Sequence, residues 1–308
     1  MSILQFNISG VNITLAENPC ADTVIPHIYH HLYDFKQAKQ LGFTVGAYKH
    51  YKNVEFPVGI KENPNFAFNW NRTSWNEYLD VQFSFHKILR GGYNHSGYKK
   101  ASDYEVARLY NTDLINKFLR RETGFGIIKN SIGLTEHFDV RNQMLERVDI
   151  GLNVGCGNRP NCEIVLDYYA AKLLIRKGNR LFRVENGIYL FNKAACKGVP
   201  EGIVDLKDVA KFERQATRVL HIYIKNDTTV RFETRSIGLQ TVNRAVKRAS
   251  VYGEIKNNLY DITNLHATNM LFWQDVLPLF NKAQKAEIID RYLLDTLPHF
   301  KDSTLVNF

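Results

Sequence analysis

The chain has 308 residues, of which 44% are hydrophobic and 12% are aromatic. That is enough apolar surface for one large core or two modest ones, and no low-complexity tract is present, which excludes a disordered or fibrous protein. Forty Lys and Arg against 31 Asp and Glu give a formal net charge of +9 that is spread along the chain, and this favours a polyanionic partner such as nucleic acid.

The four cysteines (Cys20, Cys156, Cys162 and Cys196) lack the paired spacing of a zinc site, so we expect reduced thiols. No stretch reaches the roughly 18 uninterrupted apolar residues of a membrane span, and the N-terminal segment has neither the basic start nor the apolar core of a signal peptide. We therefore expect a soluble, cytoplasmic protein with no membrane partner.

The first 85 residues are predicted to be mostly β. Alternation predicts a strand over 3–15, helical spacing predicts a helix over 28–40, and short aromatic-rich strands are predicted at 43–47, 54–60, 66–70 and 78–85. His27, His30 and His31 share one face of the predicted helix. Because no acidic residue is spaced with them, packed or solvated histidines are favoured over a metal site.

A glycine-containing loop and a helix follow. Lys87 and Arg90 lie close to the Gly91-Gly92 pair, where backbone amides and charge suit phosphate, and a solvated loop is the equal alternative. The pattern over 102–123 predicts a helix with Ser102 as its N-cap and with Val106 and Leu109 on its apolar stripe.

The strand predicted over 146–154 has two different faces. Val148 and its alternate neighbours are apolar, whereas Arg147, Asp149 and Gly151 lie on the other side. Gly151 leaves room for a ligand or another backbone to approach. An Asp is unfavourable in a central strand, so we expect Asp149 to lie near an edge or to have a charge partner.

A helix is predicted over 163–177, and a hairpin over 181–191 with its turn at Asn186-Gly187. That turn places Tyr189 opposite Val184 and on the same face as Phe182 and Phe191. Tyr189 is therefore expected to be part of the core and not a catalyst.

A second hairpin, over 219–235, is also two-faced. If its apolar residues share one face, Ile224 must pair with Val230 or Phe232, which requires an odd-numbered loop such as 227–229. The same register gathers four functional side chains on the opposite face, namely Tyr223, Lys225, Arg231 and Glu233. A phenol beside cations and a carboxylate is suited to phosphoryl chemistry; a salt-bridged sheet face with a packed tyrosine is the alternative.

Helices complete the chain. The helix predicted over 238–252 carries Arg244, Lys247 and Arg248 within about one turn, which suits either a phosphate backbone or a solvated face. Two apolar helices over 264–283 and 285–297 must pack together or against the sheet. We predict an α+β fold of antiparallel sheets packed with helices, with one domain over 1–250, or two β-rich halves over 1–135 and 136–250, and a helical part over 251–308.

Several motifs occur in a recognisable order: F-S-F-H-K-I-L-R-G-G-Y-N, a helix, E-R-V-D-I-G-L-N, N-G-I-Y-L-F-N-K, H-I-Y-I-K and V-R-F-E-T-R. This order, over roughly 81–235, resembles the gene II/X replication initiators of filamentous phages and related plasmids. The resemblance implies a rolling-circle initiator (HUH-like) core and an enzyme that nicks one strand of a supercoiled origin. It further implies single-stranded DNA, a host helicase and a host polymerase as partners, and the cytoplasm of a bacterial host as location.

Carried over by position, the resemblance implies Tyr223 as the nucleophile, Lys225 as its companion, and Asp149 and Glu233 as ligands of Mg²⁺ or Mn²⁺. The related plasmid enzymes would select Tyr189 instead. Because the His-hydrophobic-His motif of many nicking enzymes is absent, the third metal ligand stays open among Glu185, His86 and His221. Arg147, Arg231 and Arg235 join the basic residues above as predicted DNA contacts, and Lys225 or Arg231 is expected to lower the pKa of Tyr223.

Two functions from other classes compete with this enzyme. A non-enzymatic DNA- or RNA-binding protein would account for the basic charge and would bind without metal. A structural assembly protein would account for the aromatic β half and needs no face that combines acids with a tyrosine.

Overall fold

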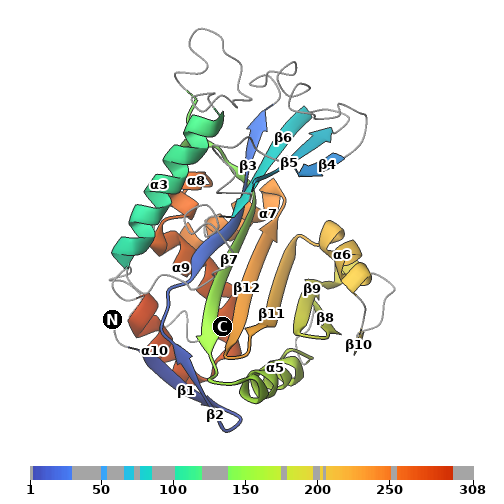
Figure 1. Cartoon of the computed structure of the whole chain (residues 1–308), viewed down its shortest axis with the longest axis vertical. Helices are drawn as coiled ribbons and strands as arrows, with labels where there is room; N and C mark the ends of the chain where they lie inside the picture. Colours follow the sequence, from blue (N-terminus) through green and yellow to red (C-terminus); the bar gives the residue numbers. More distant parts are fainter. Residues whose placement is uncertain are drawn as a thin grey trace.

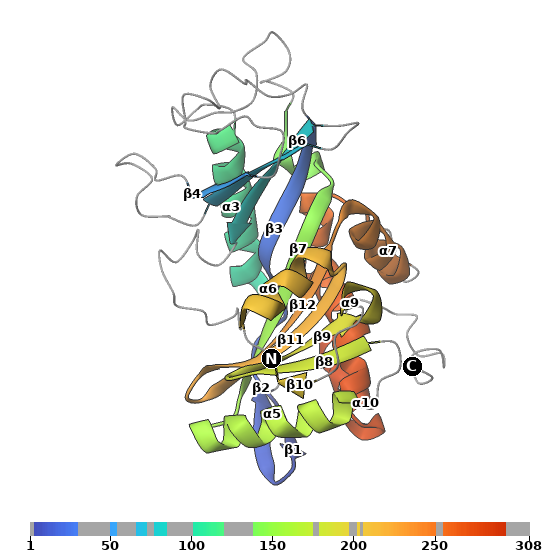
Figure 2. The ribbon, with the colours of Figure 1, turned by 90° about the vertical axis from the view of Figure 1, so that its right-hand side faces the viewer.

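The structure is a computed structural model, and ten segments of it are described (Figure 1). They are residues 3–29, 50–53, 66–72, 77–84, 101–119, 138–174, 179–196, 202–203, 206–250 and 255–293. The fold is α+β, as predicted: one large, almost entirely antiparallel sheet is packed against helices (Figures 1 and 2).

The sheet runs in the order β10-β8-β9-β11-β12-β7-β3-β6-β5-β4, with β2 also joining β7 at one position. All neighbours are antiparallel except β10 and β8. The long strand β7 lies between β12 and β3 and so connects the two halves of the sheet. The strands are β3 (Cys20–Tyr29), β4 (His50–Asn53), β5 (Phe66–Arg72), β6 (Glu77–Ser84), β7 (Leu145–Gly155), β8 (Asn179–Val184), β9 (Gly187–Asn192), β10 (Gly202–Ile203), β11 (Arg218–Asn226) and β12 (Thr229–Ile237).

The N-terminal prediction was wrong in two places. Residues 3–15 form a hairpin of β1 (Leu4–Ile8) and β2 (Val11–Leu15), because Ser9 and Gly10 both take positive φ (50° and 87°) and reverse the chain. Residues 28 and 29 end β3 instead of starting a helix, and His27 lies in that strand next to Glu146 (Nδ1–Oε2 3.6 Å). The predicted segments at 30–40, 43–47 and 54–60 lie outside the described residues.

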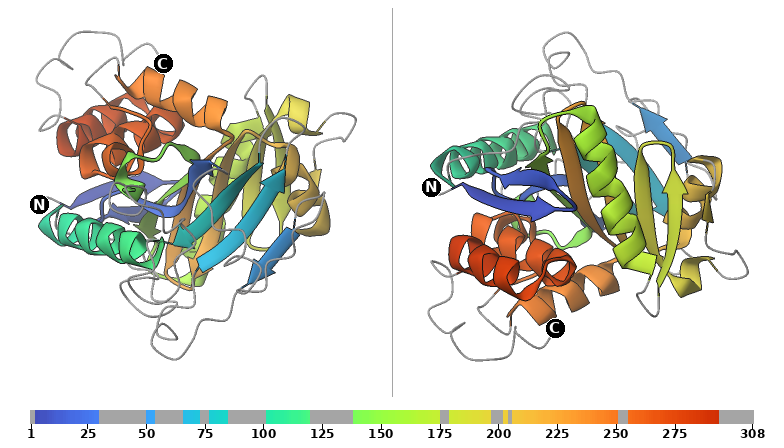
Figure 3. Two further views of the ribbon diagram at one scale, coloured as in Figure 1. Left: turned by 90° about the horizontal axis from the view of Figure 1, so that it is seen from above. Right: turned by 90° about the horizontal axis from the view of Figure 1, so that it is seen from below.

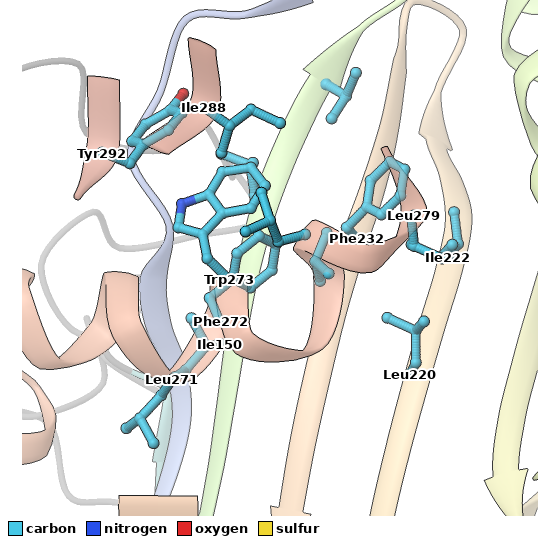
Figure 4. Packing of buried hydrophobic residues seen from close by; sticks show 14 of the residues in the cluster. Ile150, Leu220, Ile222, Phe232, Leu271, Phe272, Trp273, Leu279, Ile288 and Tyr292 are labelled. Atoms are coloured by element: carbon cyan, nitrogen blue, oxygen red, sulfur yellow. The ribbon is translucent and has the colours of Figure 1, made fainter. Parts of the chain in front are cut away.

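The apolar face of the sheet is covered by helices (Figure 3). Trp273 and Phe272 of α9 pack in one core with Ile150 of β7, Ile222 of β11 and Phe232 of β12 (Figure 4). The helices that share this core are α5 (Arg159–Leu174), α7 (Leu239–Ala249), α8 (Leu259–Ile262), α9 (Leu265–Val276) and α10 (Lys282–Tyr292), with the 3-10 turn η5 (Leu277–Leu279). The C-terminal helices thus pack against the sheet, one of the two arrangements expected.

One helix covers part of the opposite face. α6 (Leu206–Gln215) and the 3-10 turn η3 (Lys193–Cys196) close a second, smaller cluster. In it, Phe212 of α6 stacks on Phe182 with ring centroids 4.8 Å apart, and Phe191 and Val219 complete the contact. The rest of this face carries the polar residues described below.

α3 (Ala101–Leu119) packs against α9 and the short turn η2 (Val140–Asn142). Two residues predicted on its apolar stripe, Val106 and Leu109, are instead 68% and 49% exposed. The buried side is mainly polar: Arg108 donates to the carbonyl of Tyr260 at 3.0 Å, and Asn116 donates to Asp139 at 2.8 Å. Ser102 lies inside the helix and not at its N-cap.

Among the helices that the structure describes, none combines the length and the apolar composition needed to cross a membrane.

Candidate active site

Alternate residues of β11, β12 and β7 place the predicted site on one face of the sheet. Tyr223 pairs with Arg231, and Arg231 pairs with Asn153. One row away, His221 pairs with Glu233, and Glu233 with Gly151; in the row beyond, Arg235 pairs with Asp149. Directly paired residues point to the same side, so Asp149 and Glu233 face one side of one sheet, as two ligands of one ion must.

The β11–β12 hairpin has the predicted register, with Ile224 opposite Val230. The loop differs in detail: Asn226 pairs with Thr229 around a two-residue turn, and the odd residue is a bulge at Lys225. Asn226 Oδ1 accepts from the Thr228 backbone N–H at 3.0 Å, which stabilises this turn. The bulge keeps the apolar residues of the two strands on one face of the sheet, as a three-residue loop would have done.

Tyr223 is only partly buried, and its hydroxyl faces Glu233, with Oη 3.5 Å from Oε2. Burial, followed by the nearby Glu233 carboxylate, raises the pKa of Tyr223 above its ordinary value, although Arg231 acts in the opposite direction. Arg231 therefore lowers this pKa as expected, but burial and Glu233 outweigh it, and the net shift is upward. The phenol stays protonated at neutral pH.

Arg231 lies over Gly151 and is 2% exposed. Its guanidinium donates to Asp22 Oδ2 at 2.7 Å, to Asn153 Oδ1 at 3.2 Å and to Glu233 Oε2 at 3.4 Å. An ideal Cβ on Gly151 would lie 2.2 Å from Arg231 Nη2, so the space left by the glycine is filled by this side chain. The close approach expected at Gly151 is thus made by the protein's own arginine.

Arg235 links the remaining carboxylates. Its Nε lies 2.7 Å from Glu233 Oε1 and 3.7 Å from Asp149 Oδ2, and its Nη1 pairs with Glu213 of α6. Arg147 adds a two-bond contact to Asp149 at 2.9 and 2.5 Å. Asp149 therefore has the charge partners expected for an acid in a central strand.

The ionic network has a nearly balanced charge. Three guanidinium groups and four carboxylates alternate across the sheet: Arg147, Arg231 and Arg235 with Asp22, Asp149, Glu213 and Glu233. Burial is the largest influence on Glu233 and opposes ionisation, but Arg235 and Arg231 outweigh it and hold its pKa below the ordinary value. The three arginines thus form ion pairs within the protein, and the buried Arg231 in particular is not accessible to a phosphate backbone.

The predicted metal ligands are near each other, because Asp149 and Glu233 both contact the Nε of Arg235. Their oxygens cannot be farther apart than these two contacts end to end, whereas two oxygens bound to one ion lie at most about 5 Å apart. As arranged, however, both carboxylates are neutralised by guanidinium groups, and no cluster of three or more His, Cys, Asp or Glu suited to a metal occurs among the described residues. The donor set fits arginine and not a divalent cation, so Mg²⁺ or Mn²⁺ stays a prediction.

The candidates for a third ligand lie in different places. His221 is directly opposite Glu233 on the site face. Glu185 is exposed at the β8–β9 turn, and His86 lies outside the described residues.

Tyr189 lies in the smaller core cluster at 8% exposure, as predicted, and burial raises its pKa to about 12. The predicted register of its hairpin was wrong by two residues, since Tyr189 pairs with Phe182 instead of Val184, and Val184 pairs with Gly187. The turn residues are 185 and 186, and Gly187 belongs to β9 because Tyr223 lies over it: an ideal Cβ on Gly187 would lie 2.9 Å from Tyr223 Cβ.

Lys225 is partly buried beyond Tyr223. Burial and the charge of Arg231 lower the pKa of Lys225 to about 8, against the opposing effects of Asp22 and Glu17. At neutral pH the Lys225 amine is mostly protonated, and its lowered pKa means that it releases this proton readily.

The other predicted DNA contacts do not join the site. Arg244, Lys247 and Arg248 are exposed on α7, whose buried residues Val242 and Val246 belong to the core on the opposite face of the sheet. Lys87 and Arg90 lie outside the described residues. The sequence reasoning missed Asp22 and Glu213, because acids so distant along the chain give no local signal of pairing with Arg231 and Arg235.

Comparison of the chain with protein-family models, with curated proteins and with solved structures finds no match in any of the three.

Proposed function

We propose that the protein nicks one strand of DNA by transesterification, with Tyr223 as the nucleophile, and acts as a rolling-circle replication initiator. The observation that supports this most directly is the partly buried Tyr223 hydroxyl facing the Glu233 carboxylate at 3.5 Å on a face otherwise filled with paired charges. A hydroxyl nucleophile next to a fixed carboxylate is the arrangement that an activated oxygen requires. The HUH-like core is part of this proposal.

The chemical step is a phosphoryl transfer. Tyr223 Oη attacks the phosphorus, the Oη–P bond forms and the P–O3′ bond breaks, which leaves a 5′-phosphotyrosine and a free 3′-hydroxyl. Because the Tyr223 phenol is protonated at neutral pH, its proton must leave as the new bond forms, and Glu233, kept ionised by Arg231 and Arg235, is the acceptor within reach. Reversal of the same step rejoins the ends.

Lys225 is the proposed proton donor to the departing 3′ oxygen. Its pKa of about 8 lies close to neutral pH, where a general acid is both protonated and able to release its proton. Arg231, one of the charges that act on this amine, pairs directly with Tyr223 on the site face.

Tyr223 is favoured over Tyr189 as the nucleophile. Tyr189 is 8% exposed and packed beside Phe191 in the smaller core, whereas the Tyr223 side chain is only partly buried. A phosphodiester bound at Tyr223 would therefore displace less of the core than one bound at Tyr189.

The remaining parts of the proposal come from the sequence. A supercoiled origin and its single strand are the proposed substrates, with a host helicase and polymerase as further partners in a bacterial cytoplasm, and the +9 charge is consistent with DNA binding. Mg²⁺ or Mn²⁺ is proposed as a cofactor whose role would be to neutralise phosphate charge. Asp149 and Glu233 would bind it only if the guanidinium groups moved away.

The proposed function is tested with a supercoiled plasmid that carries a candidate origin, end-labelled DNA strands derived from it, and wild-type protein in Mg²⁺, Mn²⁺ or EDTA. Relaxed circles together with label that stays on the protein after denaturation support the proposal. Wild-type protein that binds the DNA but forms no adduct under any of these conditions contradicts it. The Tyr223→Phe variant is the matched control, since it removes one oxygen.

A second candidate function rests on a different observation. The exposed Arg244, Lys247 and Arg248 of α7 lie across the sheet from Tyr223 and are not joined by an acidic residue within that helix. A basic protein that binds nucleic acid without cutting it would use this surface. In that case, replacing the three cations by alanine weakens DNA binding, while Tyr223→Phe changes no measurable property.

A further inference from the structure

Four rings form a column that ends at Tyr223. His221 lies face to face between Tyr189 and Tyr223, with ring centroids 3.8 and 4.2 Å away and interplanar angles of 13° and 21°. Tyr189 is in turn parallel to Phe191, at 5.7 Å and 6°. Tyr223 is the only member of this column that is not buried.

The end of the column opposite Tyr223 lies in the smaller core. Phe191 packs against Phe212 of α6 with centroids 5.9 Å apart, and both belong to the smaller core. From this base the rings cross from β9 to β11, where His221 pairs with Tyr189 in the ladder. Within the column, His221 is the ring that connects Tyr223 to this packed core.

Gly187 provides the space that the column needs. A Cβ at this position would lie 2.9 Å from Tyr223 Cβ and 3.1 Å from His221 Nε2, both closer than ordinary contact. Any larger residue at Gly187 would therefore push both rings away from the strand. The rings of Tyr223 and His221 can lie over the backbone of β9 because residue 187 is a glycine.

The His221 ring makes no hydrogen bond through its Nδ1 to any of the described residues. The residue is 7% exposed, and this nitrogen is buried. Burial, then Arg235 and Arg231, lower the pKa of His221 well below its ordinary value, so the ring is neutral. His221 therefore presents a flat, uncharged ring face to Tyr189 on one side and to Tyr223 on the other.

We propose that His221 is a positioning residue for Tyr223: its ring, clamped between Tyr189 and Tyr223, fixes the Tyr223 ring so that the hydroxyl faces Glu233. This proposal rests on the proposed role of Tyr223 as nucleophile. An exposed phenol on a strand can turn about χ1 and χ2, and a parallel ring in contact with one of its faces restricts that motion. Misplacement of a reacting atom by about 1 Å can reduce a rate by about 100-fold.

The test compares His221→Phe, which keeps a flat ring, with His221→Ala and His221→Leu, which remove it. The rate of covalent adduct formation is measured in single-turnover reactions with saturating single-stranded DNA, and the Kd for that DNA is measured separately. We expect His221→Phe to react within about threefold of wild type, and the Ala and Leu variants to lose about 100-fold in rate with Kd changed less than about twofold. His266→Ala is the matched control, because it removes a histidine from α9, outside the column.

A second readout does not depend on activity. In protein with ¹³C-labelled tyrosine rings, the Tyr223 signals are assigned by their loss in Tyr223→Phe, and the neighbouring ring shifts them. We expect those signals to move in His221→Ala and to stay ring-shifted in His221→Phe, without DNA. Leu serves where Ala fails to fold, as judged by circular dichroism.

The outcomes separate the two proposals. A wild-type protein that forms no adduct, but whose Tyr223 signals respond as expected, overturns the nicking function and leaves the stacked position of Tyr223 intact. The positioning role is overturned if His221→Phe is as slow as His221→Ala, since the imidazole nitrogens would then be needed. It is also overturned if His221→Ala and His221→Leu react at the wild-type rate.

Discussion

The substitution Gly151→Ala tests whether Arg231 fills the space beside β7. An ideal Cβ there would lie 2.2 Å from Nη2, 2.4 Å from Cζ and 2.7 Å from Nε of Arg231. The guanidinium must therefore shift by more than ~1 Å to restore an ordinary contact of about 3.5 Å. Such a shift breaks the contacts to Asn153 and Glu233, which are already 3.2 and 3.4 Å long.

The loss of stability comes from the buried Glu233 carboxylate, which is separated from the Arg231 guanidinium. Glu233 is 5% exposed, and separating a buried ion pair costs about 3–5 kcal/mol. Replacing glycine by alanine reduces the entropy of the unfolded chain and returns about 0.4–1 kcal/mol. We therefore expect Gly151→Ala to lower the free energy of unfolding by about 3 kcal/mol.

The matched control is Gly155→Ala on the same strand. Its Cβ would meet Thr14 Cβ at 3.6 Å, an ordinary contact, so we expect a change within about 1 kcal/mol of wild type. Both variants are measured by urea unfolding followed by far-UV circular dichroism, with m-values compared. If Gly151→Ala unfolds within about 0.5 kcal/mol of Gly155→Ala, Arg231 does not occupy the position described and the ionic network must be redrawn.

Three further results are expected. Tyr223→Phe abolishes the covalent adduct and leaves the DNA Kd within about twofold in a filter-binding assay, whereas Tyr189→Phe keeps most activity because only one oxygen is lost from a packed ring. Because Glu233 is buried and paired with Arg235 and Arg231, we expect Glu233→Gln to destabilise the protein by about 3 kcal/mol in urea unfolding. The folded-state pKa of Glu233 is below the ordinary 4.5, so its contribution is present above that pH and lost as the pH falls below it, and acid unfolding of Glu233→Gln should be correspondingly less steep. Finally, the adduct-forming rate of wild type should fall as the pH rises through about 8, where Lys225 loses its proton, and Lys225→Arg should remove that decline; an unchanged profile in the variant would assign the decline to another group.

Much of the site face could be predicted because strand periodicity is a local property. The alternation in 219–235 fixes which side chains share a face within each strand, and matching the apolar faces of the two strands correctly grouped Tyr223 with Arg231 and Glu233. The resemblance assigned Asp149 to the same site as Glu233, and the pairing of β12 with β7 places both on one face.

The rest depends on contacts between distant segments. Asp22 pairs with Arg231 across 209 positions, at a place where the register of β3 shifts between Ala21 and Val24, and no local pattern signals that pairing. Gly187 was assigned to a turn because an Asn-Gly pair usually forms one, but it pairs with Val184 and Tyr223 in the sheet, where Tyr223 leaves no room for a Cβ. On α3, a polar contact with Tyr260 outweighs the apolar stripe that the helical period suggested.

Peptide mapping of the protein–DNA adduct tests the central claim most directly. After reaction with origin DNA, the protein is digested and the nucleotide-bearing peptide is sequenced by mass spectrometry. The account predicts that the phosphotyrosine lies at Tyr223, in the peptide that contains His221 and Lys225. Modification at Tyr189 or any other tyrosine, or no adduct with wild-type protein that is folded and binds the DNA, would contradict it.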